Sequence, residues 1–285
     1  MDRFMDALEQ GNLETLRKCP KADLHNHFAL GGSRRFLYQA TGKKIEPLVH
    51  PLASMAEMDQ WSQKYIGQYF NSNEGRKLLI RATFQQAKED GVTVLEIGED
   101  VWGLKEFFHN DIDELVESFT SAQREIAPEI ELRLQIGLSR HCPISYLEDC
   151  LSYFWGNKNF YSIDLYGDEF AQPIENFKGI YRRAKKEGLR LKAHVGEWGT
   201  AKDIRTAVEE LELDEVQHGI AAAGDESVIR FLAENKIRLN ITPTSNVLLG
   251  RVADMAEHPI GKLYRSGIAV SYTHLRAHET CADLV

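Results

Sequence analysis

The stretch Pro20-Lys21-Ala22-Asp23-Leu24-His25-Asn26-His27 decides how this chain is interpreted. It ends in two histidines two positions apart, and on a β-strand that spacing places both imidazoles on one face. Neutral imidazole nitrogens are common ligands of zinc and similar divalent metals. Two ligands do not complete a metal site, so without further support the pattern would indicate two histidines on a half-exposed strand.

Other apolar, strand-like segments also stop at polar groups. Lys192-Ala193-His194-Val195-Gly196-Glu197 ends in a histidine and an acid. Segment 162–169 ends in glycine and acids, 216–219 contains His218, and 241–246 ends in Thr-Ser-Asn. Polar chemistry at the carboxyl ends of strands is typical of a (β/α)8 barrel. The sequence therefore predicts an α/β fold of the TIM-barrel type.

Hydrophobic periodicity places the elements of this barrel. We expect strands at 22–27, 92–98, 131–138, 160–166, 190–196, 215–218 and 237–242, with a shorter one near Gly267. We expect helices at 3–18, 74–90, 111–126, 145–154, 173–187, 200–211 and 225–235. This alternation predicts one barrel domain over residues 1–270. The long stretch 33–80 lies between the first two strands, and connections of this length often form lids or binding elements.

Composition excludes several classes of function. The 285 residues carry a net charge of −9, which argues against a nucleic-acid partner because such binding needs a basic surface. Apolar runs are shorter than a membrane span, and residues 1–20 lack a signal-peptide pattern, so we expect a cytoplasmic protein without a membrane partner. The four cysteines form no C-x-x-C pair and are interpreted as reduced thiols. The oligomeric state stays open.

The ordered motifs resemble the adenosine deaminase family of metal-dependent amidohydrolases. They are Pro-Lys-x-x-Leu-His-x-His at 20–27, Asp-Leu-x-Gly-Asp-Glu at 164–169, His-x-Gly-Glu at 194–197, His-Gly at 218–219 and Pro-Thr-Ser-Asn at 243–246. The resemblance implies a metal-dependent hydrolytic deaminase that acts on adenosine or a related small-molecule purine and releases ammonia. It also implies Zn²⁺ or a similar divalent metal as cofactor.

The resemblance assigns roles to individual residues. His25, His27 and His194 match the metal ligands, and a zinc ion held there would lower the pKa of a bound water from ~15.7 toward ~7. Glu197 matches the proton donor to a purine ring nitrogen, a role that requires burial or hydrogen bonding to keep the carboxyl group protonated at pH 7. The alternative is a set of ordinary core histidines and a solvated glutamate.

Further residues follow from the same motifs. His218 matches a catalytic histidine that orients the attacking water, although a hydrogen-bonded core histidine is the common alternative. Gly167 matches a substrate-binding glycine whose backbone approaches the purine, which a residue with a Cβ would prevent. Asp164 and Asp168 are interpreted as structural, and Asn246 is a weaker candidate for orienting the seventh loop.

One departure leaves the substrate open. The family often has Leu-Asp-Gly after the second histidine, with the Asp on the ribose, whereas this chain has Phe28-Ala29-Leu30-Gly31-Gly32-Ser33. The rivals are a sibling deaminase of adenine, of a nucleotide or of an N6-substituted adenine, and a non-catalytic barrel that only binds its ligand. Arg34 and Arg35 follow this segment, where an arginine would meet a phosphate or lie on a helix surface.

The last residues depart from the family pattern. The resemblance runs to Val270, and the sequence that follows resembles an in-frame translation of a common transposase sequencing adapter. We therefore expect residues 271–285 to be a non-native tail and the barrel to be incomplete at its eighth βα unit. The family's paired Asp-Asp should fall near Leu275 and Arg276, so this chain is expected to be impaired.

Overall fold

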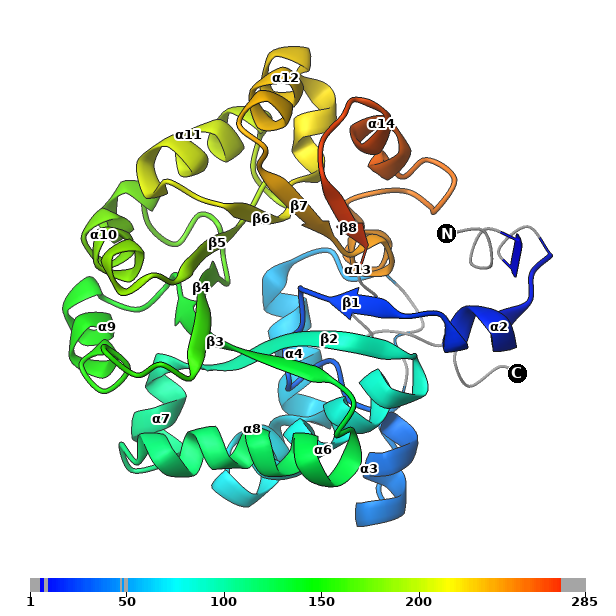
Figure 1. Cartoon of the computed structure of the whole chain (residues 1–285), viewed down its shortest axis with the longest axis vertical. Coiled ribbons are helices and arrows are strands. Elements are labelled where there is room, and N and C mark those ends of the chain that lie inside the picture. The colour runs from blue at the N-terminus through cyan, green and yellow to red at the C-terminus, as the bar shows by residue number, and fades with distance from the viewer. Residues whose placement is uncertain (1–5, 8–9, 47, 49–50, 273–285) are drawn as a thin grey trace.

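Eight parallel strands curl into a nearly closed barrel in a computed structural model that describes residues 6–7, 10–46, 48 and 51–272 (Figure 1). The strands pair in chain order from β1 to β8. They are β1 (Lys21–Asp23), β2 (Val92–Asp100), β3 (Glu131–Ser139), β4 (Phe160–Tyr166), β5 (Arg190–Val195), β6 (Glu215–His218), β7 (Arg238–Ile241) and β8 (Val270–Tyr272). The predicted α/β barrel is confirmed.

Helices surround the barrel (Figure 1). They are α2 (Leu13–Lys18), α3 (Arg34–Thr41), α4 (Met55–Tyr65), α5 (Gly67–Phe70), α6 (Asn73–Glu89), α7 (Val101–Phe107), α8 (Ile112–Ile126), α9 (Ile144–Leu151), α10 (Lys178–Glu187), α11 (Ala201–Leu211), α12 (Glu226–Glu234), α13 (Pro243–Leu248) and α14 (Ile260–Arg265), with 3₁₀ turns at Ile174–Phe177 and Ile220–Gly224. Segment 33–80 thus forms α3, α4, α5 and the start of α6.

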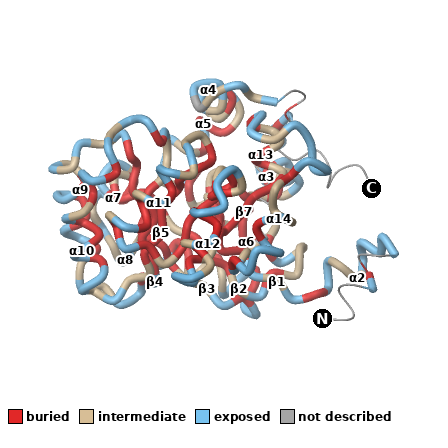
Figure 2. The backbone as a smooth tube through the Cα atoms, turned by 90° about the horizontal axis from the view of Figure 1, so that it is seen from above, coloured by how far each residue is buried: buried red, intermediate tan, exposed pale blue. Residues whose placement is uncertain are grey.

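The helices bury one apolar stripe against the sheet. On α8 the buried residues include Leu115, Phe119, Ala122 and Ile126, which recur at the spacing of one helical face. Figure 2 shows the buried part of the backbone gathered along the strands and the exposed part on the outside. The core therefore lies within the barrel and between its strands and helices, which leaves the carboxyl ends of the strands free to carry a site.

The first strand is shorter than predicted. It ends at Asp23, whose carboxylate accepts hydrogen bonds from the Asn26 side chain at 2.6 Å and from the His25 backbone N–H at 3.4 Å. Such local side-chain bonds compete with strand pairing and stop the ladder. The expectation that His25 and His27 share one face of a strand is therefore wrong, because both lie in the turn beyond it.

The eighth strand is present. Leu239 pairs with Val270, Asn240 with Ser271 and Ile241 with Tyr272 in a parallel register. The first two residues of the expected tail thus continue the sheet. The rest of that tail, including Leu275 and Arg276, lies outside the described residues, and so does any helix that follows β8.

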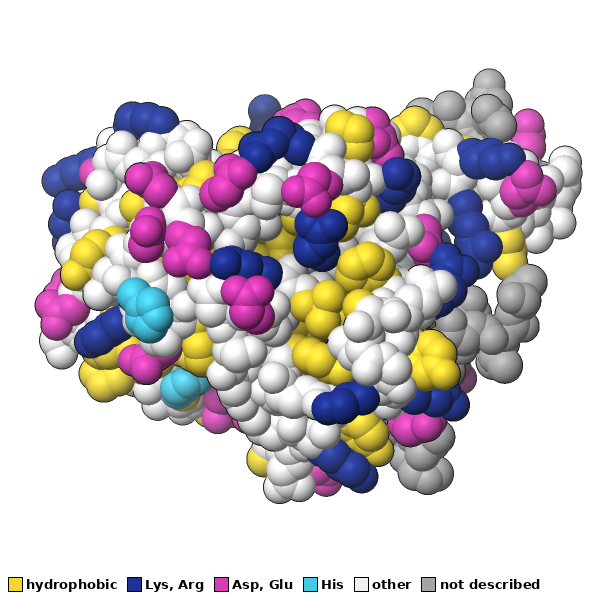
Figure 3. All heavy atoms as spheres, turned by 90° about the horizontal axis from the view of Figure 1, so that it is seen from below, with side chains coloured by type: hydrophobic (Ala, Val, Ile, Leu, Met, Phe, Trp, Pro, Cys, Tyr) yellow, Lys and Arg dark blue, Asp and Glu magenta, His cyan; other side chains and the backbone are white. Residues whose placement is uncertain are grey.

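The outer surface carries both signs of charge. In the face shown in Figure 3, Lys and Arg side chains are interspersed with Asp and Glu, and hydrophobic side chains gather near its centre. That face has no continuous basic patch of the kind that nucleic-acid binding requires. Among the residues that the structure describes, no helix is both long and apolar enough to cross a bilayer.

Candidate active site

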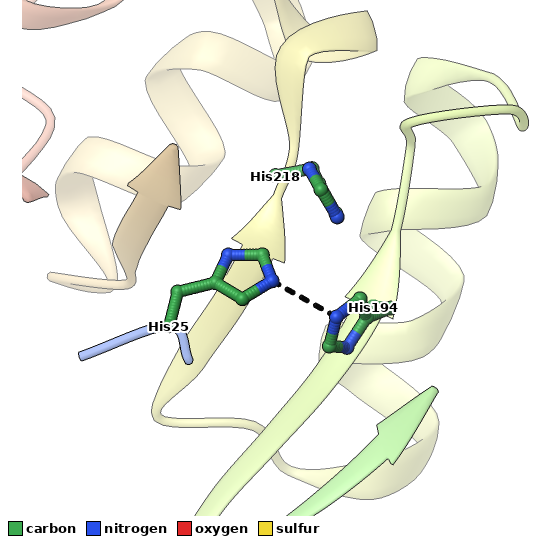
Figure 4. A group of neighbouring side chains, drawn as sticks. All are labelled: His25, His194 and His218. Atoms are coloured by element: carbon green, nitrogen blue, oxygen red, sulfur yellow. Dashed lines mark hydrogen bonds between the residues drawn. The ribbon is translucent and has the colours of Figure 1, made fainter. Parts of the chain in front are cut away.

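Three histidines from distant parts of the chain meet at the carboxyl end of the barrel (Figure 4). His25 follows β1, His194 belongs to β5 and His218 ends β6. One ring nitrogen of each lies within 4.8 Å of the others, and all three side chains are buried. His27 joins this group, since its Nε2 lies 3.1 Å from Nε2 of His194.

The ring nitrogens of this cluster are oriented by neighbouring acceptors. Nδ1 of His25 lies 2.9 Å from the backbone carbonyl oxygen of Asn240, and Nδ1 of His194 lies 3.2 Å from Oδ1 of Asp164. Each Nδ1 therefore carries the proton and donates it to an oxygen. This leaves the Nε2 lone pairs directed inward, and those of His25 and His194 are 2.9 Å apart.

This donor set fits a divalent cation. Two nitrogen lone pairs at such a distance repel each other unless a positive charge lies between them. Burial lowers the pKa of His25 well below its usual value and that of His27 to about 3, so both rings stay neutral, which is the ligand form. A histidine whose other nitrogen donates to a carboxylate or carbonyl is the usual arrangement of a metal ligand.

Glu197 lies next to these rings, in the loop after β5. Its carboxyl group is buried, and burial raises its pKa to about 7. Oε1 accepts a hydrogen bond from Nδ2 of Asn246 at 2.9 Å and lies 3.3 Å from Nδ1 of His218. A carboxyl group with this pKa is partly protonated at neutral pH and is able to donate a proton.

A chain of hydrogen bonds fixes the proton on His218. The backbone N–H of Ile260 donates to Nδ1 of His258 at 3.1 Å, so the proton of that ring sits on Nε2 and bonds Oδ1 of Asn246 at 3.2 Å. The amide nitrogen of Asn246 then faces both Glu197 and Nδ1 of His218, at 2.9 and 3.2 Å. Because Nδ1 of His218 accepts, its proton is on Nε2.

A cavity of about 270 Å³ opens beside this cluster. The part of its wall next to the histidine cluster is formed by His27, His194, Glu197 and His218. Its other walls include Phe28, Met58, Ile66, Phe70, Trp102, Tyr166, Trp198 and Leu249. The predicted lid segment 33–80 contributes Met58 and Ile66 from α4 and its end, so this segment does line the cavity.

The remaining sequence candidates fall in different places. Gly167 lines the cavity with φ +98°, a backbone conformation that favours glycine. Asp168 is exposed and absent from the lining. Arg35 is paired with Glu89 on the surface, so it lies on the outside of α3.

Sequence reasoning missed several residues around the site. Glu169 accepts backbone hydrogen bonds from the loop of Glu197, and His258 fixes Asn246 from twelve residues away. Asp164, interpreted as structural, bonds a candidate ligand. Glu169 belongs to the recognised motif at 164–169, which was a usable signal, whereas nothing in the sequence near His258 indicates its contact.

Known proteins resemble this chain in sequence and in fold. The family model described as adenosine deaminase matches residues 20–274. A putative adenosine/adenine deaminase of Treponema pallidum (strain Nichols) is 34% identical over 259 residues, covering 91% of this chain and 86% of that protein. The adenine deaminase from Arthrobacter aurescens has a similar structure, with a TM-score of 0.72 and 22% identity over 89% of this chain and 81% of that one.

An amidohydrolase from Burkholderia ambifaria, solved with bound zinc, has the same fold, with a TM-score of 0.71 and 20% identity over 92% of this chain and 78% of that one. At such identities the solved structures support the fold alone. The family match covers most of the chain and runs four residues past Val270, to residue 274. Together with the Treponema relative, it shows that this chain belongs to the adenosine deaminase family.

Proposed function

We propose that this protein removes the exocyclic amine of adenine, adenosine or a related purine by hydrolysis, and that His25, His27 and His194 hold the metal ion that this reaction needs. The observation that carries the proposal is the inward convergence of the three Nε2 atoms, at 2.9 and 3.1 Å from that of His194. Membership of the adenosine deaminase family and the name of the Treponema relative support the purine substrate.

Zinc suits the three imidazoles, since structural and catalytic zinc sites favour nitrogen ligands. The chemistry that a bound divalent cation supplies is activation of a water molecule at neutral pH. Asp164 keeps His194 in the correct tautomer for this task, and the carbonyl oxygen of Asn240 does the same for His25.

Glu197 supplies the proton. The carbon that bears the exocyclic amine becomes tetrahedral when water adds to it, and electron density moves onto the neighbouring ring nitrogen. A protonated carboxyl group beside that nitrogen neutralises the charge as it develops. Burial of Glu197 raises its pKa to about 7, which keeps much of the group protonated at neutral pH.

His218 orients the attacking water and stabilises charge on it. Its ring is buried beside His25, with ring centroids 4.5 Å apart. Because its Nδ1 accepts a hydrogen bond from Asn246, its proton is on Nε2. Gly167 lets the backbone of the loop after β4 approach the flat face or edge of the base, because no Cβ intervenes.

Metal content and turnover test the proposal together. We expect purified protein to retain zinc after dialysis against metal-free buffer and to release ammonia from adenine or adenosine at a measurable rate. His194→Ala should lose both properties, whereas His109→Asn, at an exposed histidine far from the cluster in sequence, should keep both. A protein that binds purines but releases no ammonia when saturated with zinc would instead be a non-catalytic barrel, and the proposal would be wrong.

A further inference from the structure

The cavity has an unusual balance of charge. No Lys or Arg belongs to its lining in the part of the chain that the structure describes. Five carboxyl groups do belong to it: Asp59, Glu99, Asp100, Glu169 and Glu197. Phosphate groups are bound in proteins mainly by arginine, lysine and backbone N–H groups, so this lining is poorly suited to a phosphorylated ligand.

One buried cation, Arg76, lies behind the inner wall of the cavity and is paired there. Arg76 on α6 has no exposed surface, and its guanidinium is paired with the carboxylate of Glu99. The guanidinium carbon also lies 4.0 Å from the ring centre of Phe70 and 5.0 Å from that of Trp102. Its charge is therefore neutralised by Glu99 and enclosed by aromatic rings, out of reach of a ligand.

Two other arginines are also engaged by neighbouring groups. Arg251 stacks on the ring of Trp198 at 4.5 Å and donates from Nε to the backbone carbonyl of Glu197 at 3.1 Å. Arg35, a sequence candidate for a phosphate contact, forms an exposed ion pair with Glu89 at 2.7 Å. Neither side chain lines the cavity.

The outer edge of the cavity, its rim, carries a carboxylate and not one of these arginines. Asp59 lies on α4, lines the cavity and is exposed. Burial of part of the group raises the pKa of its carboxyl, and the charge of His141, across the rim, offsets some of that rise. Among the described residues, no hydrogen bond or ion pair engages the Asp59 carboxylate, so it is free to meet a ligand.

The rim position fits the outer end of a purine ligand. Nδ1 of His141 lies 3.7 Å from the position where a Cβ on Gly167 would stand, so His141 borders the glycine proposed to approach the base. The amine-bearing carbon must lie at the opposite end, beside His194 and Glu197. With the base in this orientation, a substituent that leaves it away from the amine would run toward α4 and the loop after β3, both of which contribute to the lining.

We infer that this pocket accepts uncharged adenine compounds, the free base or its nucleoside, and rejects 5′-phosphorylated nucleotides, with Asp59 as the rim residue that determines this specificity. The inference rests on the proposed function, since it names the substrate class of the same site. A phosphate carries about −1.5 to −2 charges at pH 7, and a like charge opposite it costs several kcal/mol. Sugar hydroxyls, in contrast, are able to donate hydrogen bonds to Asp59.

Charge variants on one helix turn test this assignment. The values of kcat/KM for adenine, adenosine and AMP are measured at low salt for the wild type, Asp59→Asn and Asp59→Lys. Gln60→Lys is the matched control, because Gln60 is the exposed neighbour on α4 and is absent from the lining. We expect the wild type to prefer an uncharged substrate over AMP by about 100-fold or more.

Asp59→Lys should narrow that preference by about tenfold or more, and Gln60→Lys should leave it nearly unchanged. The effect of Asp59→Lys on this preference should become smaller when the ionic strength is raised, because the Debye length is about 8 Å at 0.15 M salt. Turnover of AMP equal to that of adenosine in the wild type would overturn the inference. So would an equal response of the Asp59 and Gln60 variants.

Binding separates this result from a failure of the proposed function. If no purine is turned over, the affinities for adenosine and AMP are measured by calorimetry with the same variants. We expect a wild type that fails as a deaminase still to bind adenosine more tightly than AMP. If Asp59→Lys is the one variant that reverses this order of affinity, the specificity assignment is supported even though the deaminase proposal has failed. Equal affinities for the two ligands would overturn it.

Discussion

The carboxylate of Glu169 holds the backbone of Glu197 in place. It accepts hydrogen bonds from the backbone N–H groups of Gly196 at 2.8 Å, Glu197 at 2.9 Å and Trp198 at 2.8 Å. Hydrogen bonds to an ionised group are about twice as strong as neutral ones. The loop after β5 is therefore anchored from β4, and the side chain of Glu197 is held against Asn246.

Glu169→Gln should reduce kcat by roughly 10- to 100-fold, because a hydrogen bond to a charged group contributes about 1.5–3 kcal/mol. The amide has one oxygen in place of two and turns its N–H₂ toward a backbone N–H. Zinc content and KM should change little, since none of the proposed ligands is altered and the amide has nearly the size and shape of the carboxyl group that it replaces in the cavity lining. Steady-state kinetics with parallel metal analysis check this.

Asp168→Asn is the control for that variant, since Asp168 is the adjacent acid, exposed and outside the cavity lining. It should behave as the wild type does. If Glu169→Gln kept the wild-type kcat, the position of Glu197 would not depend on these three bonds.

Glu197→Gln should bind zinc normally and lose about 10²–10⁴-fold in kcat, which is the range attributed to positioned proton transfer. The amide keeps the shape and the hydrogen bond from Asn246 but has no acidic proton to give. Metal analysis and ammonia release on the same preparation separate the two effects. Near-wild-type turnover would exclude Glu197 as the acid.

The pH profile should report the same carboxyl group. Burial raises the pKa of Glu197 to about 7, and the hydrogen bond from Asn246 opposes that rise. Because the acid must be protonated to act, kcat should fall as the pH increases beyond this pKa. Asn246→Leu removes the opposing bond and should move the falling limb to higher pH. An unchanged limb would mean that another group controls it.

Much of the fold was predictable because it depends on local patterns. β4 and β6 occupy the predicted residues 160–166 and 215–218, since each is a short apolar run bounded by polar groups. The short helices α7 and α13 were not predicted. Each begins within two residues of the end of a strand and is too short for helical periodicity to be visible in the sequence.

The residues of the candidate site were predictable from the sequence, but the hydrogen-bond partners that orient them were not. His25, His27 and His194 belong to motifs that stand out in the sequence, and the structure brings their Nε2 atoms together. The contacts that orient them come from positions far away in the chain, such as the carbonyl group of Asn240. Such contacts depend on how the strands are ordered in the barrel, and the sequence around each histidine does not indicate them.

Asp164→Asn should weaken zinc affinity by about 10- to 100-fold, as expected when the partner of a ligating histidine is removed. Oδ1 of Asp164 faces Nδ1 of His194 at 3.2 Å, and Oδ2 accepts from Gln217 at 3.1 Å. The amide either loses the charge opposite His194 or turns a donor toward it. Competition with a chromogenic chelator measures the change, and an unchanged affinity would contradict His194 as a ligand.

A buried ion cluster lies in the barrel below the site. Nζ of Lys192 lies 2.7 Å from Oε1 of Glu96 and 3.2 Å from Oε2 of Glu215, and all three side chains are almost fully buried. Nε of Arg190 and Nη1 of Arg238 each lie 3.0 Å from Oε1 of Glu215. Glu215 is thus the carboxylate on which three cations converge, and its charge links β5, β6 and β7.

Glu215→Gln should therefore destabilise the fold in a pH-dependent way. Burial alone would raise the pKa of Glu215, but Lys192 and the other neighbours outweigh it and bring the pKa to about 2. An unfolded glutamate titrates near ~4.3, so the ionised group contributes roughly 3 kcal/mol to the free energy of unfolding above that pH. The contribution is lost as the pH falls from ~4.3 toward 2.

Urea unfolding should show a deficit of about 3 kcal/mol for the variant at pH 7, which shrinks steadily toward pH 2. Glu212→Gln, at an exposed pair with Lys185, should stay within about 0.5 kcal/mol of the wild type throughout. A deficit for Glu215→Gln that did not change with pH would show that packing, and not the carboxylate charge, is what the substitution removes.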